Sequence, residues 1–243
     1  MRVGIIGGTG LTSLEGLEIT QREVVRTPYG EPSAPLIHGR FRGHEVTFLA
    51  RHGYSHTIPP HRINYRANIW ALRQAGVRDV IAVAAVGGIG DEYAPRRLAI
   101  PDQIIDYTHS RIATFFDEDL EQVTHIDFTY PYDAEVRGWL LHAARQAGVE
   151  AIDGGTYGAT QGPRLETAAE IRRLRQDGCH LVGMTGMPEA ALAREAELRY
   201  AHCAVVANWA AGLDGGQPLS MDEIRDHLTY GMDAVRQLIG CLP

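Results

Sequence analysis

The chain has 243 residues, 44% hydrophobic and 22% charged, so it can bury a full core as one large α/β domain or as two small ones. Its net charge of −7 and the absence of a basic run argue against a nucleic-acid partner or a charged membrane surface. No apolar run approaches the roughly 18 residues of a membrane span, and a strand pattern stands where a signal peptide would carry its apolar segment. The sequence therefore predicts a soluble, cytoplasmic protein, in which any bound anion is held by a local pocket.

Strand patterns recur along the chain, and helix patterns lie between several of them. The strand patterns fall at 2–7, 45–50, 79–86, 98–105, 154–160, 180–184 and 202–208. The helix patterns fall at 60–75, 166–176, 188–200 and 221–239. Such alternation is typical of a largely parallel sheet covered by helices. Because we find no internal repeat, low-complexity segment or linker, we expect residues 1–243 to form one α/β domain.

The first strand pattern runs into a glycine-rich loop, "GIIGGTGL". Glycine has no Cβ, so such a loop can fold its amides around an anion. A dinucleotide fingerprint would require a third glycine where Ser13 stands, and the chain contains no lysine for a nucleotide-binding P-loop. The loop therefore predicts a smaller anion, such as inorganic phosphate.

Polar side chains also follow other predicted strands, at the edge where ligands of such sheets gather. The residues at these ends are Thr9, Arg51, His52 and Thr185. Each alone is typical of a surface or turn residue, but together they supply the converging donors that phosphate needs. His52, His56 and His61 are also spaced like metal ligands. Because glycine and prolines break that segment and no acidic residue lies nearby, we predict no metal site.

Five longer segments fall in order across nearly the whole chain: "GIIGGTGL", "RHGYSHTIPPHRINYRANIWAL", "GGTYGATQGPRLETAAE", "VGMTGMPEAALAREAELRYA" and "VVANWAAGL". With them the chain resembles the trimeric purine nucleoside phosphorylase and methylthioadenosine phosphorylase family. The resemblance implies a single nucleoside phosphorylase domain, with a twisted, mixed but largely parallel sheet flanked by helices, assembled as a homotrimer. It implies attack of inorganic phosphate, as co-substrate, on C1′ of a purine nucleoside, with neither a redox cofactor nor a metal.

The same resemblance assigns roles to individual positions. The family's phosphate-binding positions are matched by Thr9, Arg51, His52, Ala84, Ala85 and Thr185. Met184 matches the position that packs against the ribose. We expect Arg51, His52, Glu166 and Asn208 to carry the reaction, by holding phosphate near C1′ and stabilising the departing purine.

The base is expected to contact Glu166, Asn208, Leu165 and Ala210. The family's 6-oxopurine enzymes carry a glutamate where Glu166 stands, and Asn208 and Ala210 replace an Asp-x-Asp arrangement of the methylthioadenosine enzymes. A carboxylate can accept from the N1–H of hypoxanthine, whereas an amide can donate to O6 and accept from protonated N7. The alternatives are that Glu166 caps a helix and that Asn208 only ends its strand in a turn.

The 5′ end of the sugar is expected to contact Met221 and Ile224. Met221 matches the position of a histidine that binds the 5′-hydroxyl in ordinary purine nucleoside phosphorylases, and a thioether there favours a 5′-methylthio group. His125 resembles a family residue that reaches the 5′ region from the adjacent subunit. The alternative for Met221 is ordinary core packing in an amphipathic helix.

The two ends together imply phosphorolysis of a 5′-methylthio purine nucleoside, preferably 5′-methylthioinosine, in purine salvage. Two other enzymes remain as alternatives, a methylthioadenosine phosphorylase and an inosine/guanosine phosphorylase. A non-enzymatic nucleoside-binding protein of the same fold is a further alternative.

Overall fold

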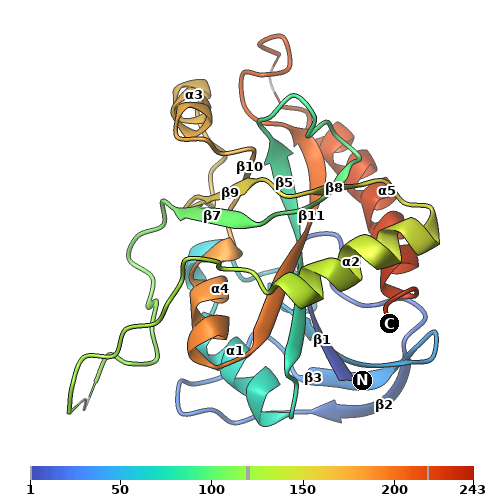
Figure 1. The fold of residues 1–243 in the computed structure, drawn as a ribbon, viewed down its shortest axis with the longest axis vertical. Coiled ribbons are helices and arrows are strands. Elements are labelled where there is room, and N and C mark those ends of the chain that lie inside the picture. The colour runs from blue at the N-terminus through green and yellow to red at the C-terminus, as the bar shows by residue number, and fades with distance from the viewer. Residues whose placement is uncertain (1, 119–120, 218) are drawn as a thin grey trace.

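A mixed sheet of eleven strands runs through the computed structural model, which describes residues 2–118, 121–217 and 219–243 (Figure 1). The strands are β1 (Arg2–Gly7), β2 (Glu18–Glu23), β3 (Leu36–Phe41), β4 (His44–Ala50), β5 (Asp79–Gly88), β6 (Leu98–Ile100), β7 (Gln103–Asp106), β8 (Ala151–Asp153), β9 (Thr156–Ala159), β10 (Leu181–Gly183) and β11 (Arg199–Trp209). Their hydrogen-bonded order is β2-β3-β4-β1-β5-β10-β9-β7; in addition β11 pairs with β5 and β6, and β8 pairs with β6.

Parallel pairing predominates in this sheet. The parallel pairs are β1–β4, β1–β5, β5–β11, β9–β10, β7–β9 and β6–β8. The antiparallel pairs are β2–β3, β3–β4, β5–β10 and β6–β11. The predicted fold class, α/β with a mixed and largely parallel sheet, is therefore confirmed.

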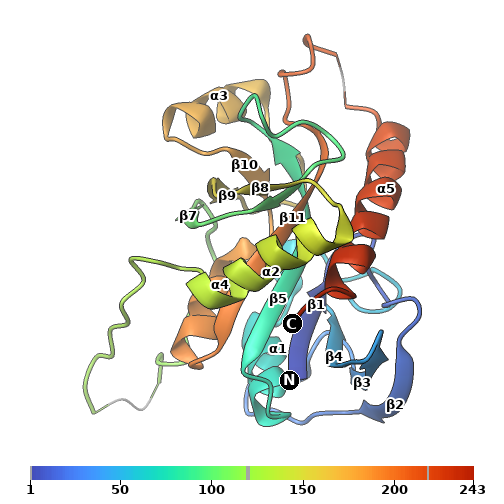
Figure 2. The same cartoon turned by 45° about the vertical axis from the view of Figure 1, so that its right-hand side comes forward.

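Helices cover the sheet in two groups. The helices are α1 (Tyr65–Gln74), α2 (Ala134–Ala147), α3 (Ala168–Gln176), α4 (Gly186–Glu195) and α5 (Met221–Ile239), with a short 3₁₀ turn at Pro60–Arg62. Helices α2 and α5 pack on each other and on β11, while α1 packs against α4 (Figures 1 and 2). Helix α3 lies beyond β9 and β10 and buries Ile171 and Leu174 in a second, smaller core. In the part of the chain that the structure describes, no helix combines the length and apolar character that crossing a membrane requires.

The central strands β1, β5 and β11 are buried on both faces. Ile5, Ile81 and Val205 have no exposed surface, which is why these strands read as continuous apolar runs in the sequence. Gly7 at the end of β1 lies opposite Ala50 at the end of β4, and β5 and β11 end side by side at Gly88 and Trp209. The polar residues that follow these strands are thereby brought to one edge of the sheet.

The predicted elements are confirmed in part. The helix at 221–239 matches α5, and the strands at 2–7, 45–50, 79–86, 154–160, 180–184 and 202–208 are present with small shifts at their ends. The predicted helix 188–200 is wrong at its end, because α4 ends at Glu195, Glu197 turns the chain with a φ of 57°, and residues 199–200 already belong to β11. The predicted strand 98–105 is divided at Pro101, which has no N–H for the ladder, into β6 and β7.

Two predicted helices begin later than expected. The segment 60–75 opens with the 3₁₀ turn, and α1 begins only at Tyr65. Asn64 is the N-cap residue of α1, and its side chain accepts a hydrogen bond from the Ala67 amide. The segment 166–176 becomes helical at Ala168. Strands β2, β3 and β8 and helix α2 were not predicted; β2 is an exposed edge strand without apolar alternation.

Candidate active site

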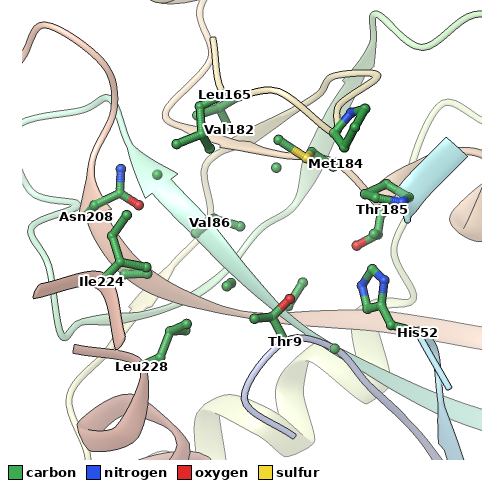
Figure 3. A pocket seen from close by; sticks show the side chains of 18 of the residues that line it. Thr9, His52, Val86, Leu165, Val182, Met184, Thr185, Asn208, Ile224 and Leu228 are labelled. Carbon is green, nitrogen blue, oxygen red and sulfur yellow. The ribbon is translucent and has the colours of Figure 1, made fainter. Parts of the chain in front are cut away.

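A cavity of about 540 Å³ lies at the ends of β1, β4, β5, β10 and β11, beside the start of α5 (Figure 3). All but one of the predicted site residues line it: Thr9, Arg51, His52, Ala84, Ala85, Leu165, Glu166, Met184, Thr185, Asn208, Ala210, Met221 and Ile224. In Figure 3 the side chains of Thr9, His52 and Thr185 lie together at one end, and Asn208 lies at the other. The predicted phosphate and base residues therefore face one space.

The glycine-rich loop after β1 lies so close to Arg51 and β5 that only glycine fits at position 8. A Cβ on Gly8 would lie 2.7 Å from the Arg51 Nη1 atom and 2.7 Å from the Val83 carbonyl oxygen. The Leu11 amide donates to the Gly8 carbonyl at 3.0 Å, and Gly10 turns the chain with a φ of 84°. The glycines thus let the loop close over the buried guanidinium.

Arg51 is fully buried behind that loop and is held by an acidic partner. Its Nε and Nη2 donate to the two carboxylate oxygens of Glu189 at 2.7 and 2.8 Å, and Nη1 donates to the Val83 carbonyl at 2.8 Å. Burial alone would lower the pKa of Arg51, but the attraction and hydrogen bonds of Glu189 outweigh it and raise the pKa above its ordinary value. Tyr200 also donates to Glu189, at 2.8 Å. Three of the five guanidinium N–H groups are used in these bonds.

His52 is buried and neutral in this site. Its Nδ1 lies 2.8 Å from the Ile58 carbonyl oxygen, so Nδ1 carries the proton and Nε2 has a free lone pair. Burial and, next, the charge of Arg51 lower the pKa of His52 to about 4. At neutral pH this ring can accept a hydrogen bond from a ligand.

Two hydroxyl groups complete this end of the cavity. Thr9 Oγ1 lies 3.0 Å from Nε2 of His56, whose ring packs against that of His52 at a tilt of 44°, with 4.8 Å between centroids. Thr185 is the N-cap residue of α4, and its side chain does not cap the helix, so its hydroxyl is left for the cavity.

Glu166 is oriented by a neighbouring hydroxyl at the opposite end. Thr160 Oγ1 donates to Glu166 Oε1 at 2.6 Å. The alternative role of Glu166 as a helix cap does not hold, because Thr167 accepts from the Glu170 amide and Glu170 accepts in return from the Thr167 amide. Both carboxylate oxygens of Glu166 are acceptors, and one is already occupied by Thr160.

Asn208 lies within β11, one residue before its end. The pairing of β11 with β5 shifts between Val206 and Asn208, and Asn208 then lies opposite Gly87. Its Nδ2 donates to the Trp209 carbonyl at 2.7 Å, which fixes the side chain with Oδ1 free to accept. The alternative that Asn208 ends its strand in a turn does not hold, since the strand continues to Trp209.

The remaining wall is apolar and comes mainly from the start of α5. Met221 is 61% exposed as the first residue of α5, so the alternative of ordinary core packing is wrong for this side chain. Ile224 and Leu228 continue the wall along the same helix. Met184 lies across the cavity, packed against Gly162.

His125 is the predicted site residue that does not line this cavity. It is exposed in the segment between β7 and α2, which projects from the body of the molecule (Figure 1). Its predicted role concerned the site of an adjacent subunit, and that role stays a prediction.

Several residues that shape the site were missed from the sequence. Glu189 stands in the first turn of a helix, where an acidic residue usually complements the helix dipole. The available signal was its position among apolar neighbours in "GMPEAALA", because a carboxylate surrounded by buried positions requires a partner. Thr160 and His56 carried no comparable signal.

The chain is similar to proteins of known classes over almost its full length. The sequence model of a protein family described as "Phosphorylase superfamily" matches residues 2–239. A "Probable S-methyl-5′-thioinosine phosphorylase" of Xanthomonas campestris pv. campestris is 53% identical, with 98% of this chain and 95% of that protein covered. A "6-oxopurine nucleoside phosphorylase" of Pyrococcus furiosus is 45% identical, with 100% and 92% covered. The structure of a methylthioadenosine phosphorylase from Schistosoma mansoni in complex with adenine matches with a TM-score of 0.94 at 29% identity, covering 99% of this chain and 90% of that one.

Proposed function

Because this chain belongs to the phosphorylase superfamily, we propose that it cleaves 5′-methylthioinosine with inorganic phosphate, releasing hypoxanthine and 5-methylthioribose 1-phosphate. The enzyme is a nucleoside phosphorylase, and thus a pentosyltransferase. The observation that carries the choice of substrate is that one cavity has polar side chains for the base and a separate apolar wall for the 5′ group. Glu166 and Asn208 stand at the base end, and the apolar side chains of Met221, Ile224 and Leu228 form another wall.

Phosphate would occupy the end formed by Thr9, Arg51, His52 and Thr185. The Arg51–Glu189 pair carries no net charge, so attraction comes from the remaining guanidinium N–H groups, the two hydroxyls and the backbone of the glycine-rich loop at Gly8 and Thr9. Backbone of β5 at Ala84 and Ala85 lines the same end. The neutral His52 accepts a hydrogen bond from a protonated phosphate oxygen through Nε2. These contacts hold a phosphate oxygen against C1′ of the sugar, over which Met184 packs.

The base end supports a 6-oxopurine. Glu166, held by Thr160, offers its second oxygen to the N1–H that hypoxanthine carries and adenine lacks. Asn208 offers its second N–H to O6, which stabilises the negative charge that develops on the departing base. Its Oδ1 accepts from N7–H once N7 has taken a proton from solvent. Leu165 and Ala210 line the same region. Adenine would place a lone pair against the Glu166 carboxylate, which costs about 1–3 kcal/mol when buried.

The 5′ end supports an alkylthio substituent. Met221, Ile224 and Leu228 present apolar surface and a soft sulfur, which favour a methylthio group over a hydroxyl. The relatives named for methylthioinosine and the methylthioadenosine phosphorylase structures agree with this assignment.

We further propose a cytoplasmic homotrimer in which His125 of each subunit reaches the 5′ region of the adjacent site. Inorganic phosphate is the co-substrate. We propose no redox cofactor, since phosphorolysis transfers a glycosyl group without net oxidation, and no metal, since Arg51 and the glycine-rich loop supply the donors for phosphate.

The experiment compares phosphate-dependent base release from methylthioinosine, methylthioadenosine and inosine under identical conditions. We expect the highest kcat/KM with methylthioinosine. A preference for methylthioadenosine would contradict the roles of Glu166 and Asn208, and a preference for inosine would contradict that of Met221. Absence of turnover with all three nucleosides would support a nucleoside-binding protein.

A further inference from the structure

Arg111 joins the two segments on which the proposed phosphate and base residues stand. Its Nη1 donates to the carbonyl oxygens of Met184 and Met187 at 2.8 and 2.6 Å. Its Nη2 donates to the carbonyl oxygens of Thr160 and Gln161 at 3.3 and 2.8 Å. Its Nε donates to the Gln161 side-chain oxygen at 3.1 Å. One half-buried guanidinium thus binds four backbone carbonyls on two separate segments.

The first of these segments carries the proposed ribose and phosphate contacts. The carbonyls of Met184 and Met187 flank Thr185, the N-cap residue of α4. Met187 has a non-helical conformation, with φ −120° and ψ 141°, so the helix itself does not fix this turn in the usual way. Arg111 therefore supplies an external restraint on the position of Thr185.

The second segment carries the proposed base contact. Thr160 and Gln161 follow β9, and the Thr160 hydroxyl holds Glu166 at 2.6 Å. Nη1 of Arg111 also lies 3.2 Å from the Tyr65 hydroxyl, and its guanidinium lies over the Tyr65 ring at 5.5 Å. Tyr65, the first residue of α1, thus fixes the plane of the guanidinium. In that plane Nη1 donates to the segment of Thr185, and Nη2 donates to the segment after β9.

We propose that Arg111 is a positioning residue for the reaction: it sets the distance between Thr185 and Glu166, which is the distance that phosphate and nucleoside together must span. The proposal rests on the proposed function, because that function assigns phosphate to Thr185 and the base to Glu166. Lysine cannot replace Arg111 here, since a single ammonium on a flexible chain lacks the planar fork that reaches both segments.

The chain offers a matched control in Arg66, another half-buried arginine that is bound to the same loop segment. Arg66 Nη1 donates to both carboxylate oxygens of Asp117 at 3.0 and 2.8 Å, and its guanidinium lies 4.7 Å from the Tyr29 ring centroid. It therefore anchors the segment that carries Arg111 without binding any carbonyl of the site. The variants Arg111→Lys and Arg111→Ala are compared with Arg66→Lys and Arg66→Ala.

We expect Arg111→Lys to lower kcat/KM by roughly 10- to 100-fold and to raise the KM for phosphate, because small displacements of reacting groups reduce rates by about such factors. The Arg66 variants are expected to stay within about threefold of wild type. Guanidinium ion at tens of millimolar should restore part of the activity of Arg111→Ala, whereas methylammonium should not. Equal losses in the Arg66 and Arg111 variants, or no selective rescue by guanidinium, would overturn the proposal.

Two readouts keep this proposal separate from the choice of substrate. The variants are assayed with whichever nucleoside the wild-type enzyme cleaves fastest. If that nucleoside is not methylthioinosine, the proposed substrate is wrong, but the test of Arg111 is still valid. Calorimetric binding of inorganic phosphate requires no turnover. Weaker phosphate binding in Arg111→Lys than in Arg66→Lys, at equal melting temperature, supports the proposal, and equal binding contradicts it.

Discussion

Arg51 and Glu189 bind each other through two parallel hydrogen bonds, and neither side chain has any exposed surface. The pair lies directly behind the loop that carries Thr9, with Tyr200 donating to the same carboxylate. Glu189 therefore balances the charge of Arg51 and fixes the plane in which its remaining N–H groups point. The phosphate end of the cavity depends on a residue from a different part of the chain.

Replacing Glu189 by Gln should destabilise the protein and weaken phosphate binding. The Arg51 charge would stay buried without a countercharge, and breaking such a pair costs about 3–5 kcal/mol. Denaturant unfolding and the KM for phosphate measure both effects. The control is Glu170→Gln, which removes an exposed ion pair with Arg164, worth at most about 1 kcal/mol, and keeps the helix cap. Similar losses in both variants would contradict the role of Glu189.

Replacing Asn208 by Asp should shift the preference from 6-oxopurines toward 6-aminopurines. A carboxylate accepts from an exocyclic amine but cannot donate to O6, and one opposed hydrogen bond in a buried site is worth about 1–3 kcal/mol. The ratio of kcat/KM for methylthioadenosine to that for methylthioinosine should therefore rise by roughly tenfold or more. Asn208→Ala serves as the control, because it should lower both rates. Unchanged selectivity in Asn208→Asp would show that the base is recognised elsewhere.

Replacing Thr160 by Val should reduce selectivity for the 6-oxopurine, because the hydroxyl that holds Glu166 is lost while the shape of the side chain is kept. We expect kcat/KM for methylthioinosine to fall by roughly 10- to 150-fold, which corresponds to the about 1.5–3 kcal/mol of one hydrogen bond to a charged group. Thr160→Ser retains the hydroxyl and should restore most of the rate. If Thr160→Ser is as impaired as Thr160→Val, the hydroxyl is not the cause.

The site could be predicted from the sequence to the extent that it lies at strand ends. The strand patterns before Thr9, Arg51 and Asn208 are continuous apolar runs, and parallel pairing directs the ends of such runs to one edge of the sheet. Thr185 reaches the same cavity in another way, because β10 runs antiparallel to β5. The amphipathic pattern of α5 likewise predicts both ends of that helix correctly. Local pattern and tertiary structure agree in these elements.

The remaining features depend on contacts between distant residues. Nothing near Glu189 or Arg111 in the sequence indicates that one faces Arg51 and the other binds four carbonyls. The end of α4 was misplaced because the run 188–200 keeps helix-favouring alanine, leucine, glutamate and arginine almost to its end, while the backbone turns at Glu197. By contrast, α2 carried recognisable signals, with Asp133 capping its start and a left-handed glycine after its end.

Stability should fall at acid pH because of two buried histidines. Burial, followed by the charge of Arg51, lowers the pKa of His52 to about 4 and that of His202 to about 3. Both values lie below the 6.5 of an exposed histidine, so the unfolded chain binds more protons as the pH falls below about 6.5. The unfolding free energy should be unaffected by these groups above that pH and fall toward pH 4, by up to about 1.4 kcal/mol per pH unit for each histidine.

The variant His202→Phe isolates one of these contributions. His202 is fully buried among the rings of Tyr132, Tyr157 and Tyr200, and neither of its ring nitrogens has a hydrogen-bond partner among the described residues. Urea unfolding at pH 7.5, 6 and 5 should show a smaller loss in the variant than in the wild type. Parallel curves across this range would mean that His202 does not contribute to the acid instability.

Replacing Met221 by His should change the preference at the 5′ end with little effect on stability. Met221 is 61% exposed, so its loss removes little buried surface. The free energy of unfolding should therefore change by no more than about 0.5 kcal/mol, as is usual for exposed positions. The imidazole can hydrogen-bond a 5′-hydroxyl, whereas the thioether it replaces favours a methylthio group. The ratio of kcat/KM for inosine to that for methylthioinosine should therefore increase, with Ile224→Val as the apolar control from the same wall. An unchanged ratio would show that Met221 does not recognise the 5′ substituent.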